Sequence, residues 1–172
     1  MNYPRPTTEV WQRGPIDGVQ PLLQPVAHAL LQAVEELDIL MEDFFENQLW
    51  LRPAGVASPG FHLQHLSGVL DRVFTYARGE SLTEKQLLQL QEEDISPNDN
   101  WTPATLVNRF HQQVAACLNQ LKETPENILT EFRGVGRKQL PSTVIGLLVH
   151  GAEHTMRHLG QLHVTVKIIK AS

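Results

Sequence analysis

Residues 149–163 read VHGAEHTMRHLGQLH, and this stretch decides how the rest of the chain is interpreted. It holds His150, His154 and His158 at intervals of four residues. In an α-helix this interval returns a side chain to nearly the same face, one turn further along. Two imidazoles so placed can bind one metal ion together, as the two histidines of an HExxH helix do. The stretch therefore predicts a helix with a metal-binding face.

Apolar residues recur at three- and four-residue steps in four segments of the chain, which is the pattern of amphipathic helices. The predicted helices span residues 21–48 (with Pro25 as an alternative start), 61–78, 103 to about 121, and 142–169. Thr102 followed by Pro103 is a typical helix start, and Ser142 is a plausible cap for the last helix. Gly79 is expected to end the second helix.

The segments between these helices predict short or irregular elements. Residues 81–85 (SLTEK) are typical of a capped short helix, and residues 96–100 of a turn cluster. Residues 134–138 (GVGRK) lack the spacing and the Lys-Ser/Thr ending of a phosphate loop, so we interpret them as a flexible turn. No strand is predicted. We expect an all-α fold, a four-helix bundle in which a long link lets the second and third helices run parallel.

Composition limits the class of protein. The chain has 172 residues, a formal charge of −5 and a pI near 5.9, which argues against nucleic acid as its partner. The single cysteine, Cys117, excludes an internal disulfide and fits a reducing cytoplasm. No apolar run is long enough to cross a membrane. We expect a cytoplasmic protein with an irregular leader at residues 1–20, packed through Trp11 and Ile16, and one domain at residues 21–172.

A third ligand for the pair His154 and His158 is sought on the second predicted helix. His65 is in register with the apolar stripe of that helix, whereas His62 is rotated roughly 60° from it at 100° per residue. Three neutral imidazoles are the donor set of an open zinc site, and imidazole also suits nickel, copper or iron. The predicted metal ligands are therefore His65, His154 and His158.

Other residues near this set have weaker assignments. His150 lies one turn before His154, and we interpret it as a pocket-lining or a structural residue. His62 and Arg157 are further pocket candidates, while Glu153 points about 100° away from its neighbour His154 and is expected on a solvated face. His28, His111 and His163 are taken as surface or packing residues. The sequence singles out no catalytic residue.

Two segments of this chain resemble the DinB-like family of metalloenzymes. They are ASPGFHLQHLSGVLDRVFTYARGE, which contains His65, and PSTVIGLLVHGAEHTMRHLGQLH, which contains the HxxxH pair followed by LGQ. The resemblance extends from about Pro25 to Ile169. It places the leader before Pro21 outside the shared core.

The resemblance implies a four-helix bundle with a crossover between the second and third helices. It implies a divalent metal, zinc or nickel, held by His65, His154 and His158, with close packing or an outer contact at Gly160 and Gln161. Family members are often homodimers, and some use a low-molecular-weight thiol such as bacillithiol or mycothiol as co-substrate.

Three functions compete at this point. The first is a metal-dependent enzyme acting on a small-molecule substrate, in the family's version a thiol-dependent S-transferase. The second is a metal-dependent hydrolase, for which Asp38 and Glu42 are the acids that could serve as general base. The third is a non-catalytic, metal-stabilised binding or stress module.

Overall fold

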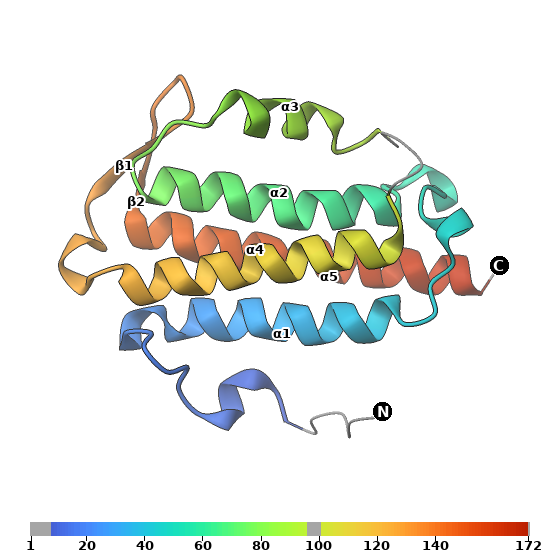
Figure 1. Cartoon of the computed structure of the whole chain (residues 1–172), viewed down its shortest axis with the longest axis horizontal. Coiled ribbons are helices and arrows are strands. Elements are labelled where there is room, and N and C mark those ends of the chain that lie inside the picture. Colours follow the sequence, from blue (N-terminus) through green and yellow to red (C-terminus); the bar gives the residue numbers. More distant parts are fainter. Residues whose placement is uncertain (1–7, 96–100, 172) are drawn as a thin grey trace.

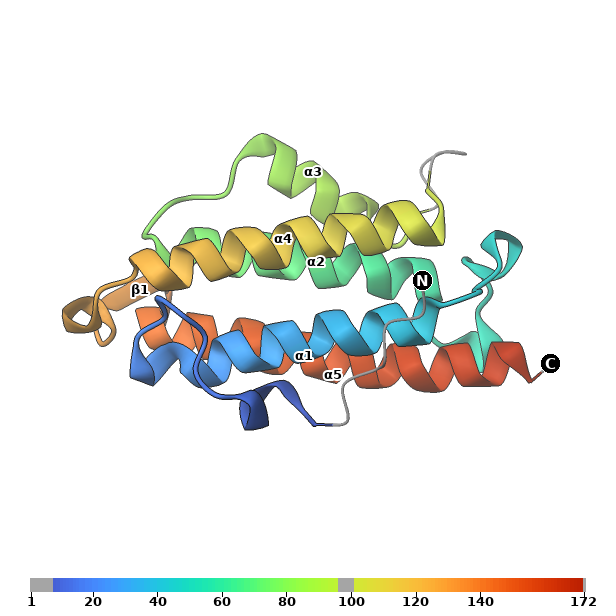
Figure 2. The same ribbon diagram turned by 60° about the horizontal axis from the view of Figure 1, so that its bottom comes forward.

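The computed structural model describes residues 8–95 and 101–171, and the protein is mostly helical. Its four long helices are α1 (Gln24–Met41), α2 (Pro59–Ala77), α4 (Pro103–Glu123) and α5 (Val144–Lys170), which lie side by side (Figures 1 and 2). Both α1 and α2 pack against α4 and α5. The chain runs in the same direction in α2 and α4 (Figure 1).

A short helix, α3 (Glu84–Glu92), follows α2 and packs on its outer side (Figure 1). It begins as the SLTEK segment predicts, because the Thr83 side chain accepts a hydrogen bond from the Gln86 backbone and the Gln86 side chain bonds back to Thr83. The predicted turn at residues 96–100 lies outside the described residues. Since α3 covers α2 on one side and α4 and α5 pack on others, α2 has little free surface.

The helix starts follow from capping residues. Ser58 caps α2 by accepting from the Phe61 N–H at 3.2 Å, and Thr102 caps α4 ahead of Pro103. The predicted cap of the last helix was wrong by one residue. Ser142 belongs to a strand, and the Thr143 hydroxyl accepts from the Gly146 N–H at 3.1 Å instead. At the other end of α2, Gly79 has a φ of 81°, as the prediction requires.

The first helix is shorter than predicted. It ends at Met41 rather than near Gln48, because Glu42 leaves the helical conformation with a ψ of 126° and Asp43 takes a left-handed φ of 55°. Phe44 then returns to the core at 7% exposure, while Phe45 is 68% exposed. The apolar pattern from which a helix was predicted therefore continues beyond Met41, where the helix ends.

The prediction that the chain has no strand was wrong. Residues 132–135 (β1, Phe132–Val135) and 140–143 (β2, Leu140–Thr143) form an antiparallel hairpin, with Phe132 opposite Thr143. Residues 134–138, predicted as a flexible turn, supply part of β1 and part of the connection between β1 and β2. Gly136 and Gln139 of this connection have positive φ. The hairpin leads directly into α5 and so sets where that helix starts.

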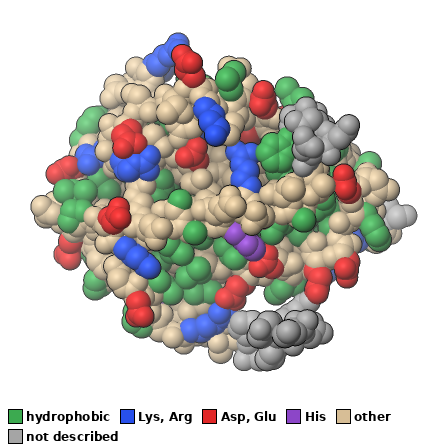
Figure 3. Space-filling model, in the orientation of Figure 1, with side chains coloured by type: hydrophobic (Ala, Val, Ile, Leu, Met, Phe, Trp, Pro, Cys, Tyr) green, Lys and Arg blue, Asp and Glu red, His purple; other side chains and the backbone are tan. Residues whose placement is uncertain are grey.

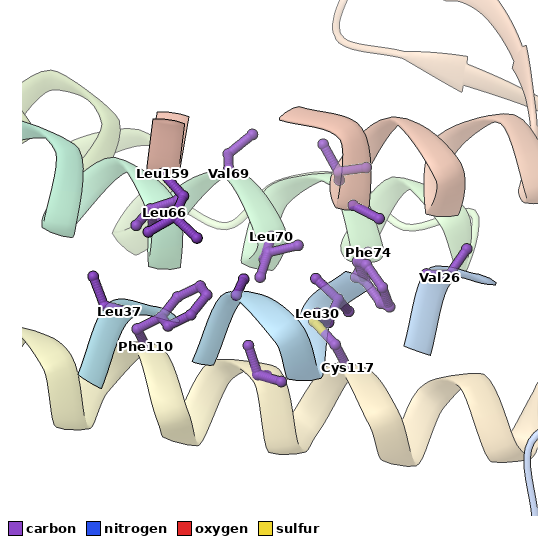
Figure 4. Close-up of a cluster of buried hydrophobic side chains, with 14 of the residues drawn as sticks. Val26, Leu30, Leu37, Leu66, Val69, Leu70, Phe74, Phe110, Cys117 and Leu159 are labelled. Atoms are coloured by element: carbon purple, nitrogen blue, oxygen red, sulfur yellow. The ribbon is translucent and has the colours of Figure 1, made fainter. Parts of the chain in front are cut away.

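The core lies between the four long helices. Phe110 of α4 is fully buried and points toward Leu37 of α1, near Leu66 and Leu159 (Figure 4). In the leader, Val10 and Val19 are buried and Ile16 packs against the core, whereas Trp11 is 60% exposed, so the expected anchoring through Trp11 was wrong. Residues 10–13 of this leader form a short 3-10 helix.

The surface carries interspersed charges. Side chains of both signs are distributed over the face shown in Figure 3, without a large basic area on that face. Among the described residues, every helix is too short or too polar to cross a lipid bilayer.

Candidate metal centre

His65, His154 and His158 come together between α2 and α5. One ring nitrogen of each lies within 4.8 Å of the others, and His65 Nε2 is 2.9 Å from His154 Nε2. The ring centroids of His65 and His158 are 4.3 Å apart. The sequence prediction that these three rings meet therefore agrees with the geometry. All three histidines are partly buried.

The cluster is assembled by helix geometry. His154 and His158 are one turn apart on α5, and their ring centroids are 4.6 Å apart. His65 reaches them from α2, where Phe61 stacks on its ring with centroids 5.3 Å apart and a 12° interplanar angle. Gly151 of α5 allows the close approach, because a Cβ there would lie 3.2 Å from Phe74 of α2. Two packed helices thus hold three rings at one place.

Burial favours the neutral form of these imidazoles. Burial and the neighbouring His65 lower the pKa of His158 to about 4, and the same causes lower the pKa of His154. The rings of His154 and His158 therefore carry lone pairs at neutral pH, as metal ligands must.

The residues present fit a divalent metal. Metal–nitrogen bonds of about 2.1 Å place neighbouring ligand nitrogens of a tetrahedral site about 3.4 Å apart. The ring nitrogens of the three histidines lie within 4.8 Å of one another, which is compatible with that distance. Among the described residues, the buried Nδ1 of His154 has no hydrogen-bond partner. Hydrogen bonding among the described residues thus satisfies Nε2 of this ring, through His65, and leaves its Nδ1 unpaired.

His62 is more deeply buried than the sequence indicated. It is 3% exposed, and its Nδ1 lies 3.1 Å from Nδ1 of His158. The expectation that it turns away from the core assumed that one face of α2 is buried, but nearly the whole of α2 is enclosed. His62 therefore contacts a predicted ligand directly.

The remaining predicted site residues are exposed. Arg157 pairs with Glu153, and His150 Nδ1 is 3.7 Å from the Glu153 carboxylate, so these three form the outer border of the cluster on α5. Gly160 and Gln161 are also exposed, and a Cβ at Gly160 would meet nothing within 4 Å. The close packing expected at Gly160 is therefore not found.

Sequence reasoning missed an acidic partner, Glu93, which follows α3. Its Oε2 lies 2.6 Å from His65 Nδ1 and its Oε1 2.6 Å from Nη1 of Arg72. Burial raises the pKa of Glu93, but the hydrogen bonds from His65 and Arg72 outweigh burial and hold this pKa below its ordinary value. No spacing signal in the sequence links residues 65 and 93. Asp38 of α1, one of the two acids that could serve as a general base, is bonded to His111 of α4 at 2.8 Å.

We expect the metal-free protein to lose stability as the pH falls from about 6.5 to 4. Burial and His65 lower the pKa of His62 to about 4, so the unfolded chain takes up this proton first on acidification. The contribution of His62 to this fall in the free energy of unfolding is on the order of 3 kcal/mol at most. Urea unfolding in EDTA at pH 7.5, 6 and 4.5 measures it, and His62→Gln should flatten the dependence. Equal slopes in both proteins would contradict this.

Comparison with known proteins bears on the fold. Residues 5–162 match the DinB superfamily, so the match includes most of the leader, which was expected to lie outside the shared core. A conserved protein of Enterococcus faecalis has a similar structure, with a TM-score of 0.68 and 17% identity over 89% of this chain and 99% of that one. A Streptococcus pneumoniae protein is also similar in structure, with a TM-score of 0.64. The two sequences are 14% identical, and the match covers 88% of this chain and 91% of that one. No curated protein sequence matches.

Proposed function

Because this chain belongs to the DinB superfamily, we propose that it binds one divalent metal ion, zinc or nickel, through His65, His154 and His158 and is a metal-dependent enzyme. The observation that carries the proposal is the convergence of three ring nitrogens within 4.8 Å from two helices. In the same proposal α1, α2, α4 and α5 form the family's four-helix bundle. The link that contains α3 is then the crossover that makes α2 and α4 parallel, and residues 21–172 are one domain.

A metal held by these histidines would act as a Lewis acid that lowers the pKa of a bound thiol or water. The chain's own residues supply the surroundings. Phe61 covers the ring of His65 and excludes water on that side. The exposed pair Arg157 and Glu153 lies one turn or less from His154 and offers a cation and an anion to a small polar substrate.

Thiol-dependent S-transfer is the version of this function that the DinB-like resemblance favours. A supporting observation concerns the chain's single cysteine. Cys117 is 1% exposed, and burial raises the pKa of its thiol to about 12, so it cannot act as the nucleophile. In an S-transfer reaction the sulfur would therefore come from a small-molecule thiol. For a hydrolase, one of the two candidate bases, Asp38, pairs with His111, and Glu42 is the other candidate.

The test uses protein loaded with zinc, nickel or cobalt, incubated with bacillithiol or another low-molecular-weight thiol and an epoxide or haloarene. We expect a thioether product and a thiol-induced change in the visible spectrum of the cobalt form. The absence of both would end the thiol version of the proposal. Light scattering tests the homodimer that the resemblance implies, and a monomer at micromolar concentration would contradict it.

A further inference from the structure

The Glu93 carboxylate is inserted between α3 and α2. The residue is 5% exposed, and each of its carboxylate oxygens has a partner at 2.6 Å, His65 for one and Arg72 for the other. Arg72 is itself only 8% exposed. A buried carboxylate with both oxygens bonded is held in one orientation, and here one of the two partners belongs to the histidine cluster.

One face of α2 is shaped to receive this residue. Gln64, Gly68 and Arg72 follow at intervals of four and so lie along one side of the helix. Gln64 donates to the backbone oxygens of Glu93 at 3.2 Å and Ile95 at 3.3 Å, which fixes the end of α3. A Cβ at Gly68 would collide with Glu93 Oε1 and lie 2.7 Å from Arg72 Nη1. Glycine at this position leaves room for the carboxylate.

We propose that Glu93 is the positioning residue of the histidine cluster, keeping the His65 proton on Nδ1 and leaving the Nε2 lone pair directed at His154. An ionised carboxylate can only accept hydrogen bonds, so the ring nitrogen facing it must donate. Arg72 carries a permanent positive charge and stabilises the ionised form of Glu93. The tautomer of His65 therefore follows from the residue that it contacts.

This inference rests on the proposed metal site and adds to it a dependence on the link between α2 and α4. Glu93 belongs to that link, whereas the three histidines belong to α2 and α5. The orientation of one ligand is consequently set by how α3 docks on α2. A change in that docking alters the metal site without touching any ligand.

Glu93→Gln tests the proposal because glutamine has nearly the same shape. Arg72 offers only donors, so the new amide oxygen is expected to face Arg72 and the amide NH2 to face His65 Nδ1. That nitrogen must then accept, which moves the His65 proton to Nε2 and blocks the metal-facing lone pair. In metal-free protein, ¹⁵N NMR of the histidine rings should show the proton on Nδ1 in the wild type and on Nε2 in the variant.

The second measurement is zinc affinity by competition with a chromophoric chelator. We expect Glu93→Gln to weaken zinc binding by about 10- to 100-fold. Gly68→Ala should act in the same direction by displacing the carboxylate, and Glu92→Gln, an exposed neighbour on α3, should leave both measurements unchanged. Far-UV circular dichroism verifies that each variant is folded.

The two measurements separate this inference from the metal proposal. If wild-type His65 carries its proton on Nε2, or if Glu93→Gln leaves the tautomer unchanged, the positioning role of Glu93 is overturned, whatever the metal affinity. If the tautomer shifts as expected while the wild type binds no zinc, Glu93 still orients His65, and the proposed metal function fails on its own.

Discussion

Replacing His154 with alanine is expected to reduce bound zinc from about one ion per chain to almost none. His154 is central to the cluster, with its Nε2 2.9 Å from that of His65 and its ring 4.6 Å from that of His158. Loss of a residue that hydrogen-bonds to a metal ligand lowers metal affinity by about 10- to 100-fold, so loss of a ligand itself should lower it by more than about 100-fold. Elemental analysis after dialysis and chelator competition measure this.

The variant should remain folded. Without metal, His154 contributes a partly buried imidazole whose Nδ1 has no partner among the described residues and whose Nε2 bonds only to His65, so its removal costs one hydrogen bond at most. His163→Ala is the matched control, since His163 lies on the same helix and is exposed. Equal zinc content in His154→Ala and the wild type would exclude the three-histidine site, and an equal loss in His163→Ala would show that the effect is not local.

Periodicity was sufficient to predict the rings that converge. The four-residue spacing of His154 and His158 defines one face of one helix, and His65 lies in the apolar stripe of another. Both inferences depend on local geometry that a sequence determines directly. The same holds for the capped start at Thr102, whose side chain bonds to backbone within three residues.

What could not be predicted depends on contacts between segments that are distant in the sequence. Glu93 reaches His65 because Gln64 and Gly68 receive the end of α3, and no local pattern signals that docking. His62 was compared with a single apolar stripe, but its ring faces α5, where its Nδ1 lies 3.1 Å from Nδ1 of His158. The hairpin at residues 132–143 was missed because its strands have four residues each, too few to show a period of two.

Phe110→Ala is expected to destabilise the protein by about 3–5 kcal/mol, much more than removal of metal from the wild type. Phe110 is 0% exposed and points from α4 toward Leu37 of α1 in the centre of the core (Figure 4). The four long helices bury their apolar faces together there, so truncation leaves a cavity that the surrounding helices fill incompletely. For a chain of this size the change corresponds to a fall in Tm of about 10 °C.

This comparison distinguishes a catalytic metal from a structural one. The histidine cluster joins α2 and α5, which already pack along their lengths through residues such as Leu70, Phe74 and Gly151. A metal ion added to such an interface stabilises the folded state only by its binding energy and is not needed to form the core. Calorimetry of the wild type with and without EDTA, beside Phe110→Ala, measures both effects. If chelation lowers Tm more than Phe110→Ala does, the metal holds the fold together, and the non-catalytic module becomes the better explanation of the site.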